Sequence, residues 1–150
     1  MKRITLLTLT VLFLLLASPL FAQEWSVYDW EISMEEARER AAAEDKELLY
    51  FFAGSDWCGW CERLIGEVFS QELFRSFESN YVIPVLIDFP RYREIPEERI
   101  NRNFQLQEEF GVQAYPTVVL LTPEGEEKFR TGYRPGGAGP YVNHLLPHVR

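Results

Sequence analysis

The two cysteines of this chain, Cys58 and Cys61, are separated by Gly59 and Trp60 and follow directly after the apolar run Leu48–Ala53. A pair at this spacing can close into a disulfide or open into a dithiol, and the sequence contains no third thiol that would compete. The feature therefore indicates a redox protein before any other kind of protein.

The composition fits a single globular domain. Of the 150 residues, 47% are hydrophobic and 15% are aromatic, so the chain can bury a core and does not have the composition of a disordered segment. We find no internal repeat and no second domain, and we expect one domain over residues 23–150.

Residues 1–22 follow the plan of a secretory signal peptide. Two basic residues precede the apolar run Ile4–Ala17, and a stretch with small residues then ends at Ala22. The run is short for a bilayer span of ~20 residues and is broken by Ser18-Pro19, which favours a cleaved leader over a retained anchor. We therefore expect an exported protein, in the bacterial periplasm or, as the alternative, secreted, where disulfides persist.

The charge balance disfavours two classes of partner. The formal net charge is -8, and removal of the leader takes away Lys2 and Arg3 without any acid. An excess of acids disfavours nucleic acid and anionic membrane surfaces as partners. We expect a monomer whose acidic surface keeps it soluble.

The hydrophobic pattern alternates between the helical period and short β-rich runs, which is typical of α/β architecture. In the helix that begins near Pro96, the residues Ile100, Phe104 and Phe110 form the expected apolar stripe. Ser70 is expected to cap a short helix that runs to about Phe77. The predicted helices cover residues 33–45, from 58, 70–77, 96–111 and 140–149, and the predicted strands cover 48–52, 81–88, 117–121 and 126–131.

This order of elements resembles the thioredoxin-like family over about Glu47 to Leu146. The motifs that carry the resemblance are Trp57–Cys61 after the first strand, Gly111–Thr117 before the hairpin and Gly132 at its end. The lead-in Gly54–Asp56 and the segment Val68–Ser70 are most similar to exported domains of the disulfide-interchange type. The resemblance implies a thioredoxin fold, with a central mixed sheet flanked by helices, here with an N-terminal helical extension.

The two cysteines are expected to have different roles. A thiol at a helix N-terminus faces unpaired amides, which stabilise the thiolate, so Cys58 is the expected nucleophile. Cys61, one turn further and more buried, would then attack the mixed disulfide and release the reduced partner. The expected partners are protein disulfides or dithiols together with a membrane-bound or soluble thiol electron donor, and no metal or organic cofactor is expected.

Alternatives to this redox role remain. A zinc site needs about four ligands, and only His144 and His148 are available in addition to the cysteines. Haem attachment requires a histidine after Cys61, where the chain has Glu62. The pair can also be a purely structural disulfide in a non-catalytic binding module. Within the redox class, reduction or isomerisation is favoured by the resemblance, and a dithiol oxidase is the alternative.

Further site residues follow from the resemblance and from position. The family implies a cis peptide bond between Tyr115 and Pro116, which would present backbone to the partner, whereas a trans turn is the plain alternative. Trp57, Gly59 and Trp60 are expected to form a flat surface for a peptide-like partner, although tryptophans here can also pack into the core.

The chain departs from thioredoxin at the position of its buried acid, where alignment gives Tyr50, and Pro84 lies near the position of the partner lysine. Asp56 and Glu62 are candidate proton carriers, or else ordinary solvated caps. The mixed-charge stretch Arg91–Arg102 is either a solvated face or a partner-specific surface. The glycine-rich segment Arg134–Pro140 lacks the residues of a phosphate loop and is expected to be a connector.

Overall fold

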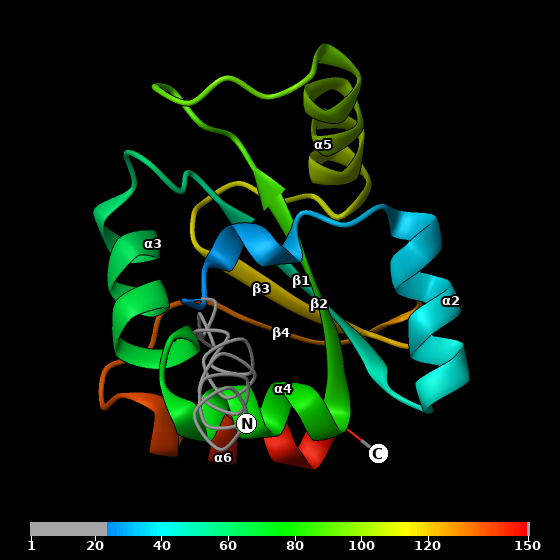
Figure 1. The fold of residues 1–150 in the computed structure, drawn as a ribbon, viewed down its shortest axis with the longest axis vertical. Coiled ribbons are helices and arrows are strands. Elements are labelled where there is room, and N and C mark those ends of the chain that lie inside the picture. Colours follow the sequence, from blue (N-terminus) through cyan, green and yellow to red (C-terminus); the bar gives the residue numbers. More distant parts are fainter. Residues whose placement is uncertain (1–23, 150) are drawn as a thin grey trace, which may run out of the picture.

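The computed structural model describes residues 24–149, which form a four-stranded sheet with helices on both faces (Figure 1). The predicted leader, residues 1–22, lies outside the described residues. In the part of the chain that the structure describes, no helix has the length and apolar character needed to cross a membrane.

The sheet is mixed, as the resemblance implies. Its strands are β1 (Glu47–Ala53), β2 (Val82–Asp88), β3 (Thr117–Leu121) and β4 (Glu127–Thr131), in the order β2-β1-β3-β4. β1 pairs in parallel with β2, whereas β1–β3 and β3–β4 are antiparallel. The four predicted strands are therefore confirmed, and β1 lies at the centre with β2 and β3 beside it.

Two cores lie on the opposite faces of this sheet. Successive side chains of a strand point to opposite faces, so Phe51 belongs to a first core and Phe52 to a second core. The first core also contains both cysteines, and it is covered by α3 (Gly59–Leu64), α4 (Glu72–Tyr81) and α6 (Ala138–Leu145). The second core is covered by α2 (Met34–Glu44) and α5 (Glu97–Glu109), on the other side in Figure 1.

The expected N-terminal helical extension is present. A short 3-10 helix, η1 (Val27–Trp30), precedes α2, whose N-cap Ser33 accepts a hydrogen bond from the Glu36 backbone N–H. Trp30 is 3% exposed, and its ring centre lies 5.0 Å from that of Phe69. The extension therefore completes the first core.

The predicted capping role of Ser70 is wrong. After α3 the chain continues as a π-helical turn, η2 (Ile65–Phe69), and Ser70 lies at its C-terminal end. The Ser70 hydroxyl donates to the Gly66 carbonyl, and α4 begins only at Glu72 and continues to Tyr81. The wider π-helical turn buries Phe69, so the packing of this side chain, and not a capping residue, determines where α4 begins.

The predicted apolar stripe of α5 is also wrong at its centre. Phe104 is 56% exposed, whereas Asn103 and Leu106 face inward. Asn103 is drawn in because its side-chain amide donates to the carbonyl of Asp88 at 2.8 Å. This bond satisfies a buried backbone acceptor at the end of β2.

Candidate active site

The chain turns sharply between the end of β1 and the start of α3. The Cys58 backbone N–H donates to the Gly54 carbonyl at 2.9 Å, and Cys58 is the N-cap of α3. Its Sγ accepts a hydrogen bond from the Cys61 backbone N–H at 3.3 Å. Both cysteines are free thiols, Cys58 8% exposed and Cys61 fully buried. The order of burial predicted for the two cysteines is therefore confirmed.

The surroundings of Cys61 oppose its ionisation. Burial raises the pKa of the Cys61 thiol, and the hydrogen bond and charge of Cys58 and the charge of Asp88 raise it further. Negative charges and an apolar environment both disfavour the thiolate form of Cys61. Cys61 is therefore a protonated thiol at neutral pH.

Asp88 is a buried acid that the sequence analysis missed. It is 1% exposed at the end of β2, and its carboxylate accepts hydrogen bonds from the Ser55 N–H at 2.9 Å and the Ser55 hydroxyl at 2.5 Å. Strand alternation places it with Leu86 on the face of the first core, whereas Tyr50 packs in the second core. The sequence did contain a signal for this residue, because an acidic residue ends a strand that is otherwise apolar.

Asp88 belongs to a polar network between distant segments. The Arg93 guanidinium donates to Asp88 at 2.9 Å and also pairs with Glu31, which in turn pairs with Arg99 at 2.6 Å. The Tyr28 hydroxyl lies 3.3 Å from the Ser55 hydroxyl. The network thus connects the N-terminal extension, the lead-in to Cys58 and the segment after β2.

Asp56 holds the segment that follows β2. Its carboxylate accepts the backbone N–H groups of Arg91, Tyr92 and Arg93 at 2.8–2.9 Å. Desolvation alone would raise the pKa of Asp56, but these backbone hydrogen bonds outweigh it and keep the pKa below its usual value. Of the two candidate proton carriers, Asp56 therefore serves as an anchor, while Glu62 is exposed on the first turn of α3.

Trp57 is half-buried beside this segment. Its indole N–H donates to the Phe89 carbonyl at 2.7 Å, and its ring meets Tyr115 edge-on at 6.0 Å. A Cβ atom at Gly54 would lie 2.2 Å from the indole, so only glycine permits this position of the ring. Trp57 therefore shows the partial core packing that was the alternative to an open platform.

Trp60 is held on the surface instead. It is 55% exposed, and its ring centre lies 5.1 Å from that of Tyr133. The Arg63 guanidinium lies 5.2 Å from each of these two ring centres and 2.9 Å from the Glu67 carboxylate. Tyr133 donates its hydroxyl to the same carboxylate at 2.6 Å. Three exposed or partly exposed side chains, those of Tyr133, Arg63 and Glu67, thus fix the orientation of the indole.

The segment before β3 completes the surroundings of the thiols. The Tyr115–Pro116 peptide bond is cis, and the Tyr115 hydroxyl donates to Gln107 at 3.0 Å. Burial raises the pKa of Tyr115 to about 12, with smaller contributions from Cys61 and Cys58. The structure therefore brings Tyr115 together with Trp57, while Trp60 contacts a different set of residues.

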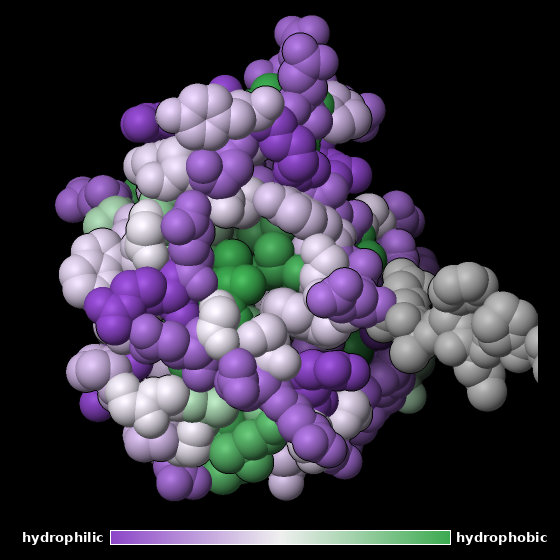
Figure 2. All heavy atoms as spheres, turned by 60° about the vertical axis from the view of Figure 1, so that its left-hand side comes forward, coloured by the Kyte–Doolittle hydropathy of each residue, from purple (hydrophilic) through white to green (hydrophobic). Residues whose placement is uncertain are grey.

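Figure 2 shows the side of the molecule that lies at the left of Figure 1, where α3 is. A small recessed hydrophobic area lies at the centre of this face. Residues of intermediate hydropathy surround it, a second hydrophobic area lies near the lower end of this face, and hydrophilic residues cover most of the rest. A partner that docks on this face therefore meets an apolar hollow inside a polar rim.

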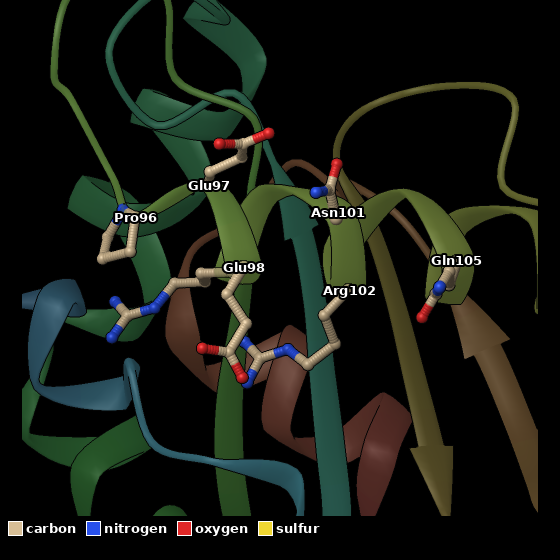
Figure 3. Close-up of a pocket in the computed structure, with 7 residues that line it drawn as sticks. Pro96, Glu97, Glu98, Asn101, Arg102 and Gln105 are labelled. Carbon is tan, nitrogen blue, oxygen red and sulfur yellow. The ribbon is translucent and has the colours of Figure 1, made fainter.

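Other candidate features of the described residues lie apart from the two cysteines. Among residues 24–149 no three His, Cys, Asp or Glu side chains are placed to hold a metal ion. The rings of His144 and His148 both pack against Phe129. A hollow of about 790 Å³ on α5 is lined by acidic, basic and amide side chains of the segment shown in Figure 3, with neither cysteine among them.

Comparisons with known proteins agree with this geometry. The family model described as a thioredoxin-like domain matches residues 34–138. Disulfide bond reductase DsbH of Chlamydia pneumoniae is 34% identical over 116 residues, which cover 77% of this chain and 69% of DsbH. The thioredoxin-related protein DsbJ of the same organism is 29% identical over 80% of this chain, which spans only 34% of DsbJ. A solved DsbH oxidoreductase superposes with a TM-score of 0.74 at 29% identity, covering 88% of this chain and 94% of that structure.

Proposed function

Because the chain belongs to the thioredoxin-like family and is a thiol–disulfide oxidoreductase, we propose that it is exported and reduces or isomerises disulfides of other proteins through Cys58 and Cys61. One observation carries the proposal. Cys58 is the N-cap of α3 and keeps 8% exposure, one turn before the fully buried Cys61. A cysteine closer to the surface followed by a fully shielded one is the arrangement that two-step exchange requires.

In the first step the Cys58 thiolate attacks one sulfur of the partner's disulfide. A bond forms between Cys58 and that sulfur, and the partner's other sulfur leaves as a thiolate. Cys61 then loses its proton and attacks the Cys58 sulfur, which forms the Cys58–Cys61 disulfide and releases the second partner sulfur. Two electrons pass to the partner, whose sulfurs take up two protons, and a thiol donor later reduces the pair again.

The second step is expected to depend on pH. Burial raises the pKa of Cys61, so only a small fraction of this thiol is ionised at neutral pH. Since the thiolate is the attacking species, release of the partner accelerates as the pH rises towards that pKa. Stopped-flow measurement of partner release from a preformed mixed disulfide tests this dependence.

The surface around Cys58 is the proposed place where the partner binds. The residues that we assign to it are Trp57, Gly59, Trp60, Tyr115 and Pro116, which supply aromatic rings, an exposed backbone turn and a cis peptide bond. Such a surface suits an extended or unfolded segment, because it offers both apolar area and backbone groups.

Single cysteine variants test the proposed exchange. We expect the native protein to reduce insulin disulfides, Cys58→Ser to lose this activity, and Cys61→Ser to accumulate a mixed disulfide with the partner at Cys58. Equal trapping by both variants would contradict the assignment of roles. Partner binding that survives replacement of both cysteines by serine, without any reduction by the native protein, would instead support a binding module.

Export is supported by the plan of residues 1–22 and by the redox pair, which needs a compartment where disulfides persist. When the full chain is produced in a Gram-negative bacterium, we expect a periplasmic protein that begins at Gln23, as mass spectrometry can establish. Retention of residues 1–22 in a membrane fraction would indicate an anchor. A thiol protein of the membrane or of the same compartment is the proposed electron donor.

A further inference from the structure

The side chain of Arg91 lies against one of the two tryptophans that flank Cys58. Its guanidinium carbon is 3.9 Å from the centre of the Trp57 ring, and the residue is exposed. Trp57 directly precedes Cys58, so this positive charge lies at the border of the surface where the proposed partner would bind.

The position of Arg91 is fixed at both of its ends. Its backbone N–H is one of three consecutive N–H groups that donate to the Asp56 carboxylate, at 2.9 Å, and its guanidinium rests on Trp57. Ordering a free arginine side chain costs conformational entropy. Because folding already orders the Arg91 side chain, less conformational entropy is lost when a ligand binds it, and the binding free energy is more favourable.

Arg91 also keeps its hydrogen-bonding capacity. Contact with an aromatic face uses the flat side of a guanidinium, while its N–H groups point outward in the plane and match a carboxylate. No carboxylate of residues 24–149 lies within salt-bridge distance of Arg91, whereas Arg63, which lies against Trp60, is paired with Glu67. The two arginines near Cys58 therefore differ: only Arg91 has an unpaired charge.

We propose that Arg91 binds a carboxylate of the partner polypeptide, so that the protein prefers partners with an aspartate or glutamate close to the reactive cysteine. Because Arg91 rests on Trp57, which directly precedes Cys58, the acid is expected within a few residues of that cysteine. The proposal rests on the proposed function, because it describes the class of partner that the same site accepts.

Matched peptide disulfides test the proposal. In the first series, Asp, Asn or Lys lies two residues before the cysteine. In the second series, the same three residues are placed two residues after the cysteine, and all other residues are unchanged. We expect the native protein to react about three- to tenfold faster with the Asp peptide than with the Lys peptide in one series, the size of effect typical of an exposed charge-assisted contact. The preference should shrink when salt is added, because salt screens exposed charges.

Variants assign the preference to Arg91. Arg91→Gln should bring the ratio of the Asp and Asn rates close to one, and Arg91→Lys should retain part of the ratio, since it keeps the charge but not the planar donors. Arg75→Gln removes the same charge from an exposed position on α4 and should leave the ratio unchanged. Asp56→Ala should weaken the preference without removing the charge of Arg91, because it releases the backbone.

The outcomes separate this inference from the proposed function. Equal rates for all peptides, or a preference that Arg91→Gln leaves intact, would overturn the role of Arg91 while exchange itself stands. If no peptide reacts, the proposed function fails instead. Binding of the same peptides with serine in place of cysteine, followed by tryptophan fluorescence, then still reports the preference, and its absence would overturn the inference.

Discussion

Trp57 and Trp60 lie on either side of Cys58, but the chain holds their rings in different ways. Trp57 is bound to the Phe89 carbonyl, in a region that Asp88, Ser55 and Arg93 tie together below the surface. Trp60 rests on Tyr133, in an exposed group that Arg63 and Glu67 complete. We call these the lead-in side and the helix side of the site.

The difference separates stability from recognition. The hydrogen bonds of Ser55 and Trp57 on the lead-in side are buried or partly buried and join residues more than thirty positions apart, so their loss leaves buried groups without partners. Contacts on the helix side are exposed or partly exposed to water, where ion pairs and hydrogen bonds contribute little free energy. We therefore expect changes on the lead-in side to lower the free energy of unfolding, and changes on the helix side to affect partner binding.

The largest effect is expected for Asp88→Asn. An amide keeps the shape of the carboxylate but has a single acceptor oxygen, so it cannot serve the Ser55 hydroxyl and Arg93 on one side and the Ser55 backbone N–H on the other. Breaking a buried ion pair is also costly. We expect a loss of about 2–3 kcal/mol in the free energy of unfolding. This is at the low end of what breaking a buried ion pair costs, because Arg93 is partly exposed. Urea unfolding measures the loss, and Glu67→Gln on the helix side should leave the free energy of unfolding nearly unchanged. Equal losses for the two variants would remove the distinction between the sides.

The next effect is expected for Gly54→Ala. The added methyl group would lie 2.2 Å from the Trp57 indole, so the ring must leave its place and lose the Phe89 hydrogen bond. Overpacking of this kind costs about 1–3 kcal/mol. Gly59→Ala is the matched control, because a Cβ there meets nothing within 4 Å and alanine is the better helix former. If Gly54→Ala were as stable as Gly59→Ala, Trp57 would not be held as described.

The smallest effect on stability is expected for Tyr133→Phe. The variant loses the hydrogen bond to Glu67 but keeps the aromatic contact with Trp60, and the lost bond is partly exposed. The free energy of unfolding should therefore change little. A slower reaction with unfolded protein substrates, at unchanged stability, would show that the orientation of Trp60 serves recognition. A loss above about 1 kcal/mol in the free energy of unfolding would instead show that the helix side stabilises the fold as the lead-in side does.

The local pattern of the sequence was sufficient for the strands, most helix boundaries and the placement of both cysteines. β1 is apolar at nearly every position, and Pro96 and Gly111 bracket α5, so these elements carry their own signals. The relative burial of Cys58 and Cys61 follows from the helical turn between them. Such features depend on neighbouring residues, which the sequence displays directly.

The polar network and the inward face of α5 depend on distant residues. Asp88 meets Ser55 across 33 positions, and Arg93 meets Glu31 across 62 positions. Asn103 is buried in place of Phe104 because a backbone carbonyl of β2 needs a donor, which no periodicity of α5 reveals. The π-helical turn η2 likewise depends on how Phe69 packs against Trp30 and Phe51.

The equilibrium reduction potential of the Cys58–Cys61 pair tests the central claim most directly. The mature protein can be titrated against glutathione or dithiothreitol, with the fluorescence of Trp57 and Trp60 next to the pair as the signal. A reductase fed by a thiol donor predicts a potential near or below that of thioredoxin, about -270 mV. A value close to that of a strong oxidant, about -120 mV, or a pair that does not titrate at all, would contradict it.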